Sequence, residues 1–584
     1  MAKSDARFEY RANLNRESFN LGEPFGLTCA PGQLLPVFED IATPKDTYYI
    51  RHDLEYLRTL PLTAPAMVDV KVHFESFFVP FQMIYQPIEQ VLFSLLNPQS
   101  DFYSTVGFVN NDFPTCNYSA IKTLMTGTNK HTKERFDFIR LCDLFGMNPY
   151  SYIEDGSNPS IFSWNPSVFP WQFLAYQTIY QYFYRLDDKE GFDNRCCNWD
   201  SAYSSTSPIT PTIPLFELRQ RPWDFDYFTS MYRSPIVSDA SMQEVLFNKN
   251  YSDLTAVDTR KIDNYGAAQS VNSDTRAFSS SVSSGFDPSN VQTAFGTSAI
   301  RQMFANEKLA MITGRARKNY DSQVLAHFGV DVPHDPKHDI SFIGRDTYEL
   351  KVGEVTSLSD TAGAGLGSLA GKGWAAGQSH EAHKFVAPCH GVVMTIMSIE
   401  PRKRYYGGYD RINALTNAFD IPTPEFDRLG NMPMYRYEAG ENAGSGAVTP
   451  VDVIGWKERY YYNKRRHPKV TLAFMNNRPS VGYNDKSAYM LTSAPFGAYT
   501  STNNNTARPD LGSRFYIDLN CMDGMMLQPY IRTWQNGLSG EETTENWNAT
   551  PWLAYARDPF IVDLNMKIKK VSWMSKDGEP VYNF

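Results

Sequence analysis

Three histidines that lie close together form the best candidate for a metal site. His380, His383 and His390 fall in one short stretch, with Glu381 and Cys389 beside them. A zincin helix needs the spacing His-Glu-x-x-His, which lets two imidazoles reach one zinc ion. The sequence here reads His-Glu-Ala-His and is one residue short. A structural zinc site is one interpretation of the group, and ordinary histidines at a surface or interface are the simpler one. We expect no bound cofactor.

A glycine-rich stretch at 361–377, TAGAGLGSLAGKGWAAG, invites comparison with phosphate-binding loops. A P-loop requires Gly, four further residues, and then Gly-Lys followed by Ser or Thr. Here Gly371 and Lys372 are followed by Gly373, and Leu366 stands where the first glycine belongs. The motif fails at both ends. We predict instead a flexible loop between two strands, because so many glycines disfavour a regular element.

Catalytic motifs are not apparent elsewhere in the sequence. It contains no Gly-x-Ser-x-Gly nucleophile elbow. Adjacent acids such as Asp187 and Asp188 are too common among 64 Asp and Glu residues to indicate the paired carboxylates of a glycosidase. We therefore predict that the protein is not an enzyme.

Basic side chains are concentrated in two places. Three tyrosines at 460–462 precede the first run, and the second lies in a strand-like segment near residue 567. The residues concerned are Lys464, Arg465 and Arg466 in the first run, and Lys567, Lys569 and Lys570 in the second. Neutralised phosphates and bases stacked on aromatic rings are how proteins bind single strands without sequence preference. A solvated face or a salt bridge between subunits is the simpler interpretation, and both stay open.

The amino-acid composition excludes several classes of protein. The 584 residues are 42% hydrophobic and 14% aromatic but only 20% charged, which argues against intrinsic disorder and against a coiled coil. A net charge of −9 excludes a chain built mainly to coat nucleic acid. The longest apolar stretch, 386–399, is too short and too interrupted to span a membrane. Seven scattered cysteines indicate no disulfide framework, and we expect a reducing cytoplasm.

Strand patterns occur at both ends of the chain. Apolar and polar residues alternate over 68–75, which predicts a half-buried strand that Pro80 stops, and they alternate again over 564–569. The run at 391–399 is apolar on both faces, as in a strand covered on both sides. Residues 25–38 are extended around a Pro-Gly turn. These distant strands are expected to share one core, with loops and excursions between them.

Three helices are expected within the intervening sequence. Residues 171–185 follow a proline, lack glycine and are apolar nearly all round, so this helix should be buried. Residues 299–312 have apolar side chains near helical spacing, and Asp321 can cap a short helix that Gly329 ends. The serine-rich stretch 236–291 has weak periodicity and is expected to be an exposed excursion.

Several segments, taken in order, resemble the major capsid proteins of microviruses, and most closely the gokushovirus and gut-phage branch. The most telling is QVLAHFGVDVPHDPKHDISFIG at 323–344. The others are FNLGEPFGLTCAPGQLLPVFEDIATPKD at 19–46, PLTAPAMVDVKVHFESFFVPFQMIY at 61–85, AYQTIYQYFYR at 175–185, DFDYFTS at 224–230, HGVVMTIMSIEPRKRYYGGYDR at 390–411 and IGWKERYYYNKRRHPKV at 454–470. Their consistent order makes the resemblance specific.

The resemblance implies a mainly β fold, a single eight-stranded viral jelly roll spanning 1–584, with long loops that carry several helices. The excursion at 236–291 matches the insertion that forms a protrusion at the threefold axes in related viruses. The implied function is a structural one. The chain would be the major capsid subunit, self-assembling into a small icosahedral shell around circular single-stranded DNA.

The implied partners are copies of the chain around fivefold, threefold and twofold axes, the single-stranded DNA genome on the inner surface, a DNA pilot protein, a small packaging protein and a host surface receptor, with no membrane. The implied location is the virion, assembled in the bacterial cytoplasm. The alternative from another class is a carbohydrate-binding or carbohydrate-active β-sandwich, because aromatic-rich β proteins often bind glycans.

Overall fold

The computed structural model describes residues 16–60, 69–85, 88–93, 113, 115–117, 133–147, 167–187, 190–193, 213–232, 297–317, 320–333, 335–356, 369–379, 381–402, 409–416, 418–427, 430–439, 453–469, 515–517, 519 and 558–574. The predicted excursion at 236–291 lies outside these residues, as does the first part of the glycine-rich stretch, 361–368.

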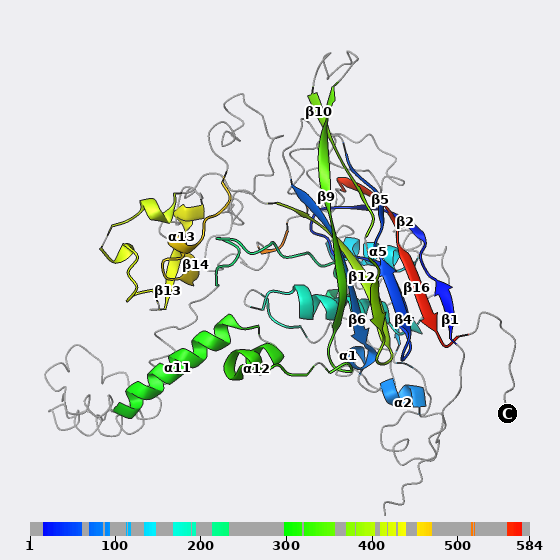
Figure 1. The fold of residues 1–584 in the computed structure, drawn as a ribbon, viewed down its shortest axis with the longest axis horizontal. Coiled ribbons are helices and arrows are strands. Elements are labelled where there is room, and N and C mark those ends of the chain that lie inside the picture. The colour runs from blue at the N-terminus through cyan, green and yellow to red at the C-terminus, as the bar shows by residue number, and fades with distance from the viewer. Residues whose placement is uncertain are drawn as a thin grey trace, which may run out of the picture.

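Two antiparallel sheets share one hydrophobic core (Figure 1). The larger sheet has the strand order β2 (Pro24–Cys29), β15 (Phe560–Asn565), β5 (Leu54–Thr59), β10 (Leu369–Gly377), β9 (Ser341–Thr356), β6 (Val70–Pro80), β12 (Gly391–Pro401) and β3 (Leu35–Ala42). The smaller sheet has the order β1 (Glu17–Asn20), β16 (Lys567–Ser572), β4 (Thr47–Arg51) and β11 (His383–Val386). This arrangement confirms the mainly β, jelly-roll type of fold, with eight strands in the larger sheet alone.

Strands from the two ends of the chain pair directly. Glu17 in β1 lies opposite Ser572 in β16, and Cys29 in β2 lies opposite Phe560 in β15. The expected strand at 564–569 is in fact two strands, since the chain passes from the larger sheet to the smaller one at Met566. The expectation that these distant strands share one core is therefore confirmed.

Strands β6 and β12 are neighbours in the larger sheet and lie between β9 and the edge strand β3. Every residue of β12 is buried, as its continuous apolar run predicted. The half-buried prediction for 68–75 holds for the exposed Asp69 and Lys71 but is wrong at His73 and Glu75, which are buried along with the apolar residues of β6. Helix α7 (Trp171–Ile179) covers this part of the sheet, so His73 and Glu75 of β6 find partners inside the protein rather than in water.

The glycine-rich stretch is not a loop throughout. Residues Leu369–Gly377 form β10, which pairs with β9 and with β5. Close packing explains why glycine is tolerated here. A Cβ atom at Gly373 would lie 2.7 Å from the Thr59 side chain, and one at Gly377 would lie 2.3 Å from the Tyr348 ring. The glycines allow neighbouring side chains to lie against the backbone.

The predicted helices are present. Helix α7 (Trp171–Ile179) continues as a π-helical turn, η3 (Tyr180–Tyr184), and is buried as expected. Helices α11 (Thr297–Arg315) and α12 (Tyr320–Phe328) project away from the sheets in Figure 1. Gly329 ends α12 with a φ of +68°, whereas Asp321 lies in the first turn rather than at the cap.

The remaining elements are short. They are α1 (Phe81–Ile84), α2 (Ile88–Phe93), α5 (Lys133–Leu144), α13 (Tyr461–Lys464), η6 (Ile213–Phe216), η9 (Arg411–Asn413), η10 (Ala418–Asp420), η11 (Arg436–Ala439), the strand pair β7 (Cys116–Asn117) and β8 (Ser167–Val168), and the pair β13 (Asn431–Tyr435) and β14 (Val453–Glu458). The β13–β14 pair has a small core of its own with α13. Among the described helices, none has the length and apolarity needed to cross a membrane.

Candidate functional site

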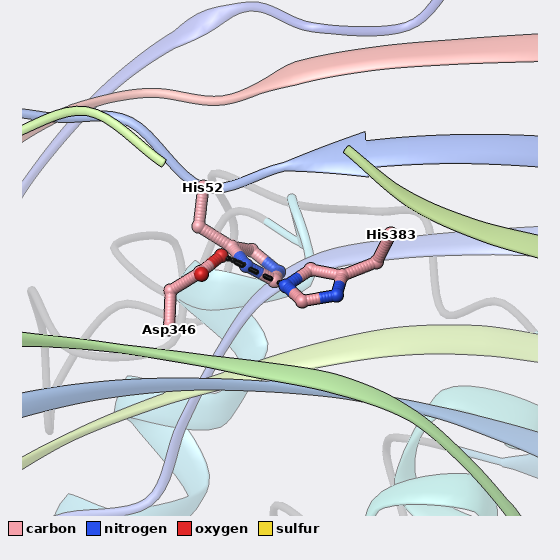
Figure 2. A group of neighbouring side chains, drawn as sticks. All are labelled: His52, Asp346 and His383. Carbon is pink, nitrogen blue, oxygen red and sulfur yellow. Dashed lines mark hydrogen bonds and ion pairs between the residues drawn. The ribbon is translucent and has the colours of Figure 1, made fainter. Parts of the chain in front are cut away.

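His52, Asp346 and His383 form a compact polar cluster between the two sheets (Figure 2). His52 lies in the link between β4 and β5, Asp346 lies on β9, and His383 begins β11. The Oδ2 atom of Asp346 is 2.6 Å from Nδ1 of His52 and 3.1 Å from Nε2 of His383. One carboxylate oxygen thus faces ring nitrogens from two other elements.

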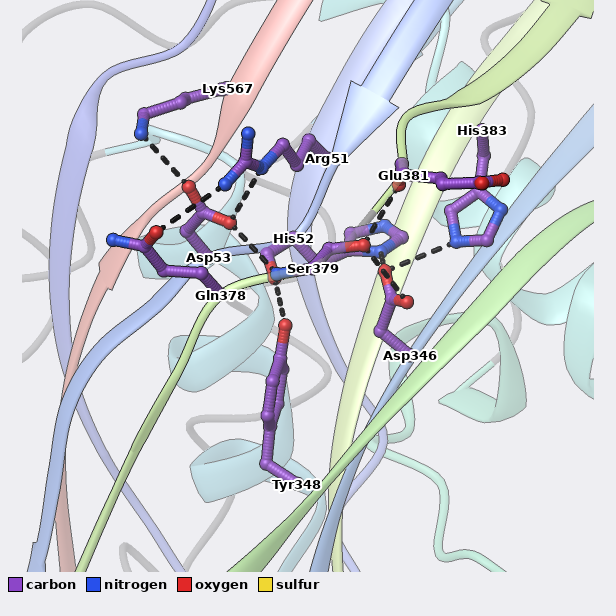
Figure 3. Close-up of polar contacts among 10 residues, drawn as sticks. All are labelled: Arg51, His52, Asp53, Asp346, Tyr348, Gln378, Ser379, Glu381, His383 and Lys567. Carbon is purple, nitrogen blue, oxygen red and sulfur yellow. Dashed lines mark hydrogen bonds and ion pairs between the residues drawn. The ribbon is translucent and has the colours of Figure 1, made fainter.

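A surrounding set of hydrogen bonds fixes this cluster (Figure 3). The Ser379 hydroxyl donates to the second Asp346 oxygen, Oδ1, at 3.1 Å. The Tyr348 hydroxyl donates to the backbone carbonyl of His52 at 2.5 Å. The other ring nitrogen of His52 lies 2.7 Å from the Ser76 hydroxyl oxygen. These hydrogen bonds therefore fix the orientations of His52 and Asp346.

Two glycines make room for the rings. A Cβ atom at Gly344 would lie 2.3 Å from Nδ1 of His383, so any larger residue there would displace this imidazole. Gly377 does the same for the Tyr348 ring. The local sequence of β9 and β10 therefore permits the cluster by leaving out side chains at these two positions.

Burial and hydrogen bonding act in opposite directions on the cluster. Burial lowers the pKa of His52, and the hydrogen bond to Asp346 only partly offsets this. Burial works to raise the pKa of Asp346, but the hydrogen bond and charge of His52, together with His383, outweigh it and lower the pKa. The carboxylate is therefore held as an anion beside a histidine that favours its neutral form.

The predicted histidine group is only partly relevant to this cluster. His383 belongs to it, His380 lies outside the described residues, and His390 lies at the turn before β12. Among the described residues, the one group whose ligand atoms are close enough to hold a metal ion consists of His52, Asp346 and His383. Sequence reasoning missed both, because His52 and Asp346 are 294 residues apart and no spacing rule connects them.

The first basic run is exposed. Lys464 pairs with Asp427 at 2.5 Å, and Arg465 donates to the backbone carbonyl of Phe225 at 2.6 Å. Arg466 lines a pocket with Arg465, His467 and the rings of Tyr227, Phe228 and Tyr462. The three rings are themselves buried in the small core of the β13–β14 pair, so the exposed groups at this surface are the cations.

The three lysines of the second basic run do not all point to the same face of β16. Lys567 and Lys569 are exposed on β16, and Lys567 pairs with Asp53 at 3.0 Å. Lys570 is buried, with its amine 2.8 Å from Asp40 and 3.5 Å from Asp46. The inclusion of Lys570 among DNA contacts is therefore a mistake, since alternate residues of a strand point to opposite faces and this one points to the core.

An aromatic side chain lies between basic ones on the outer face of the smaller sheet. In the strand register Tyr49 lies opposite Lys569 on one side and Lys384 on the other. The Lys384 amine lies 5.9 Å from the centre of the Tyr49 ring. Lys384 and Tyr49 were not among the sequence candidates, because their proximity to Lys569 arises only from strand pairing.

Helices α11 and α12 carry many exposed apolar side chains. Tyr320 and Phe328 are each 76% exposed, and none of the nine residues of α12 is buried in the described structure. Phe304 and Leu309 on α11 are 59% and 56% exposed. The two helices are tied to each other by Gln323, which donates to backbone carbonyls of Thr313 and Arg317. An apolar face of this kind is typical of a binding surface.

Comparison with known families identifies the kind of protein that has these jelly-roll sheets. The Phage_F model, described as capsid protein (F protein), matches residues 9–123 and 151–502, well over half of the chain. The chain belongs to the Phage_F capsid protein family. A search of curated protein sequences found no match.

Membership in the Phage_F family establishes the general role. The chain is a microvirus-type major capsid protein, a structural component of a phage virion that self-assembles into a shell. Nothing in the fold or the family match favours the carbohydrate-binding alternative. The described cluster, the basic surfaces and the exposed helices are therefore interpreted as parts of a shell subunit.

Proposed function

We propose that this Phage_F capsid protein, of the gokushovirus-like branch, forms a small icosahedral shell around circular single-stranded DNA in the host bacterial cytoplasm. Copies meet around fivefold, threefold and twofold axes, and the protein catalyses no reaction. The observation that supports a contact between subunits is that α12 is rich in apolar residues, yet none of its residues is buried within the described chain.

The face formed by α11 and α12 is proposed to pack against another copy of the chain. Its large apolar side chains are Phe304, Leu309, Tyr320, Leu325 and Phe328. Removing such surface from water contributes roughly 25 cal/mol per Å² of apolar area. A subunit of a closed shell must be covered by copies of itself, so a second copy is the occupant that the family match supports.

Paired substitutions test this contact. Replacing Tyr320 and Phe328 together by serine removes apolar area from residues that support no core, so the subunit should fold normally by circular dichroism. We expect shell yield, measured by sedimentation and negative-stain microscopy, to fall at least tenfold. The Phe328→Leu variant retains most of the apolar area and should assemble. Normal shell yield from the double serine variant would contradict the proposal.

The genome is proposed to contact two basic surfaces. One is the exposed run Lys464, Arg465 and Arg466. The other is the outer face of the smaller sheet, where Tyr49 lies between Lys569 and Lys384, with Lys567 on the same strand as Lys569. Cations that neutralise phosphates beside rings that stack on bases suit single strands of any sequence.

Salt dependence of DNA binding tests these surfaces. Each phosphate contact removed should reduce the slope of log affinity against log salt by about 0.7 for single-stranded DNA. We expect this reduction for Arg465→Gln with Arg466→Gln, and for Lys567→Gln with Lys569→Gln. The control is Lys337→Gln, an exposed lysine far from both runs in sequence. Unchanged slopes in both double variants would exclude these residues as genome contacts.

Further partners follow from the resemblance alone. We propose a DNA pilot protein and a small packaging protein inside the shell, and a host surface receptor that meets the segment 236–291 as a threefold protrusion. Deleting 236–291 should leave shells that form but no longer adsorb to the host. Adsorption that is unaffected by the deletion would rule out this role for the segment.

A further inference from the structure

We propose that His52, Asp346 and His383 bind one divalent transition-metal ion, with zinc as the best chemical match. The three side chains each offer one ligand atom, and these atoms lie within 4.8 Å of one another. They come from three separate elements, so the site exists only in the folded subunit. The inference concerns the isolated subunit and does not depend on shell assembly.

The donor set selects the class of ion. Two imidazole nitrogens and one carboxylate oxygen suit zinc, cobalt, nickel or copper, whereas calcium and magnesium prefer oxygen donors throughout. Ligand atoms on a tetrahedral zinc ion lie about 3.3 Å apart. The 3.1 Å between Asp346 Oδ2 and His383 Nε2 is already close to this spacing. The 2.6 Å between Asp346 Oδ2 and His52 Nδ1 has to widen by about half an ångström or slightly more.

The surrounding residues have the roles expected around metal ligands. Ligating histidines commonly donate their second ring N–H to a neighbouring oxygen, and the Ser76 hydroxyl oxygen lies 2.7 Å from Nε2 of His52. The Asp346 oxygen that would not face the ion accepts a hydrogen bond from Ser379. Both ligands are thus oriented with one atom directed at the shared position (Figure 3).

One side of the cluster is open to solvent. The His52 side chain is fully buried, whereas those of Asp346 and His383 are 18% and 25% exposed. An ion can therefore enter from the His383 side, and water can complete the coordination. Because Asp346 is on β9 of the larger sheet and His383 is on the edge strand β11 of the smaller one, the ion would link the two sheets.

Metal titration of the full chain tests the site. Unassembled subunits, freed of metal with EDTA, should bind one equivalent of Co²⁺ with the intense visible bands of tetrahedral coordination. Added Zn²⁺ should displace the cobalt. At a free Zn²⁺ concentration 100 times its dissociation constant, the unfolding equilibrium constant should fall about 100-fold. The melting temperature should rise accordingly and return to its starting value with EDTA.

Variants assign the binding to these residues. His383→Gln and Asp346→Asn should each abolish the cobalt bands, with folding checked by circular dichroism without metal. The control is His338→Gln, a more exposed histidine that pairs with Asp335 at 2.7 Å and should leave the bands unchanged. Absence of stoichiometric binding in the parent protein would overturn the proposal. So would bands that persist in a folded His383→Gln variant or that disappear in His338→Gln.

Discussion

Arg221 donates a hydrogen bond from Nη1 to the carboxylate of Glu75 at 2.8 Å, and Glu75 is fully buried on β6 of the larger sheet. The same guanidinium lies 3.4 Å from Glu400 on the neighbouring strand β12. Arg345 and the Tyr184 hydroxyl also contact Glu75. One arginine from the segment that follows η6 therefore neutralises carboxylates on two adjacent strands, β6 and β12.

Removing this arginine should destabilise the subunit strongly. Arg221→Met leaves Glu75 buried with less compensating charge, and breaking a buried pair in this way costs roughly 3–5 kcal/mol of unfolding free energy. Urea denaturation of unassembled subunits measures the loss. The matched control is Arg402→Met, since Arg402 and Asp69 form an exposed pair at 3.1 Å, and surface pairs contribute about 1 kcal/mol or less. Equal effects of the two variants would contradict this account.

Acid should destabilise the fold through Glu400. Burial works to raise the pKa of Glu400, but the hydrogen bond from His73 and the charge of Arg221 outweigh it and lower the pKa from 4.5 to about 2. Because the folded pKa lies below the unfolded one, the stabilisation is fully present above about pH 5. It is lost as the pH falls from 4.5 to about 2.

The size of this effect is on the order of 3 kcal/mol, since one pKa unit corresponds to about 1.4 kcal/mol. Urea midpoints measured from pH 7 to pH 3 should fall for the parent protein. The Glu400→Gln variant should start less stable and show a shallower decline, because it has no carboxylate to protonate. Parallel curves for the two proteins would exclude Glu400 as a source of acid sensitivity.

Adding one methyl group at Gly344 should disturb the histidine cluster. The new Cβ atom would lie 2.3 Å from Nδ1 of His383, so the imidazole must move away from Asp346. We expect Gly344→Ala to cost about 1–3 kcal/mol, the usual range for overpacking. Gly191→Ala is the control, because a Cβ atom there meets nothing within 4 Å. A neutral Gly344→Ala variant would show that His383 can be displaced without cost.

Adjacent lysines on β16 should behave in opposite ways. Lys570 is buried against Asp40 and Asp46, so Lys570→Ala leaves buried carboxylates without their cation and should cost several kcal/mol. Lys569 is exposed, and Lys569→Ala should change unfolding free energy by less than about 0.5 kcal/mol. Thermal and urea denaturation of both variants provide the comparison. A destabilised Lys569→Ala variant with a stable Lys570→Ala variant would reverse the assignment of the strand faces.

The sequence predicted those elements whose signals are local. The apolar run of β12, the proline before α7 and the glycine after α12 each mark an element without reference to the rest of the chain. The polar contacts were not predictable in this way. Glu75 looked like a solvent-facing position because alternation cannot show that Arg221 and α7 cover that face.

The candidate sites, too, could be predicted only where their residues are close in sequence. The basic runs could be found because their members are neighbours in sequence. The period of two of a strand also indicates that Lys570 points to the other face of the sheet from Lys567 and Lys569. The His52–Asp346 contact depends on β9 pairing with β6 and on the passage from β4 to β5. Pairings between segments so far apart are set by the fold as a whole and leave no local pattern.

The pairing of β1 with β16 and of β2 with β15 has a consequence for the order of events during synthesis. Strands β1 and β2 pair with strands that are synthesised more than 500 residues later. Neither sheet can therefore be complete while the chain is still being synthesised. Contacts this distant in sequence also form slowly. A polypeptide interrupted before residue 560 lacks the partners of β1 and β2, so such a fragment cannot complete either sheet.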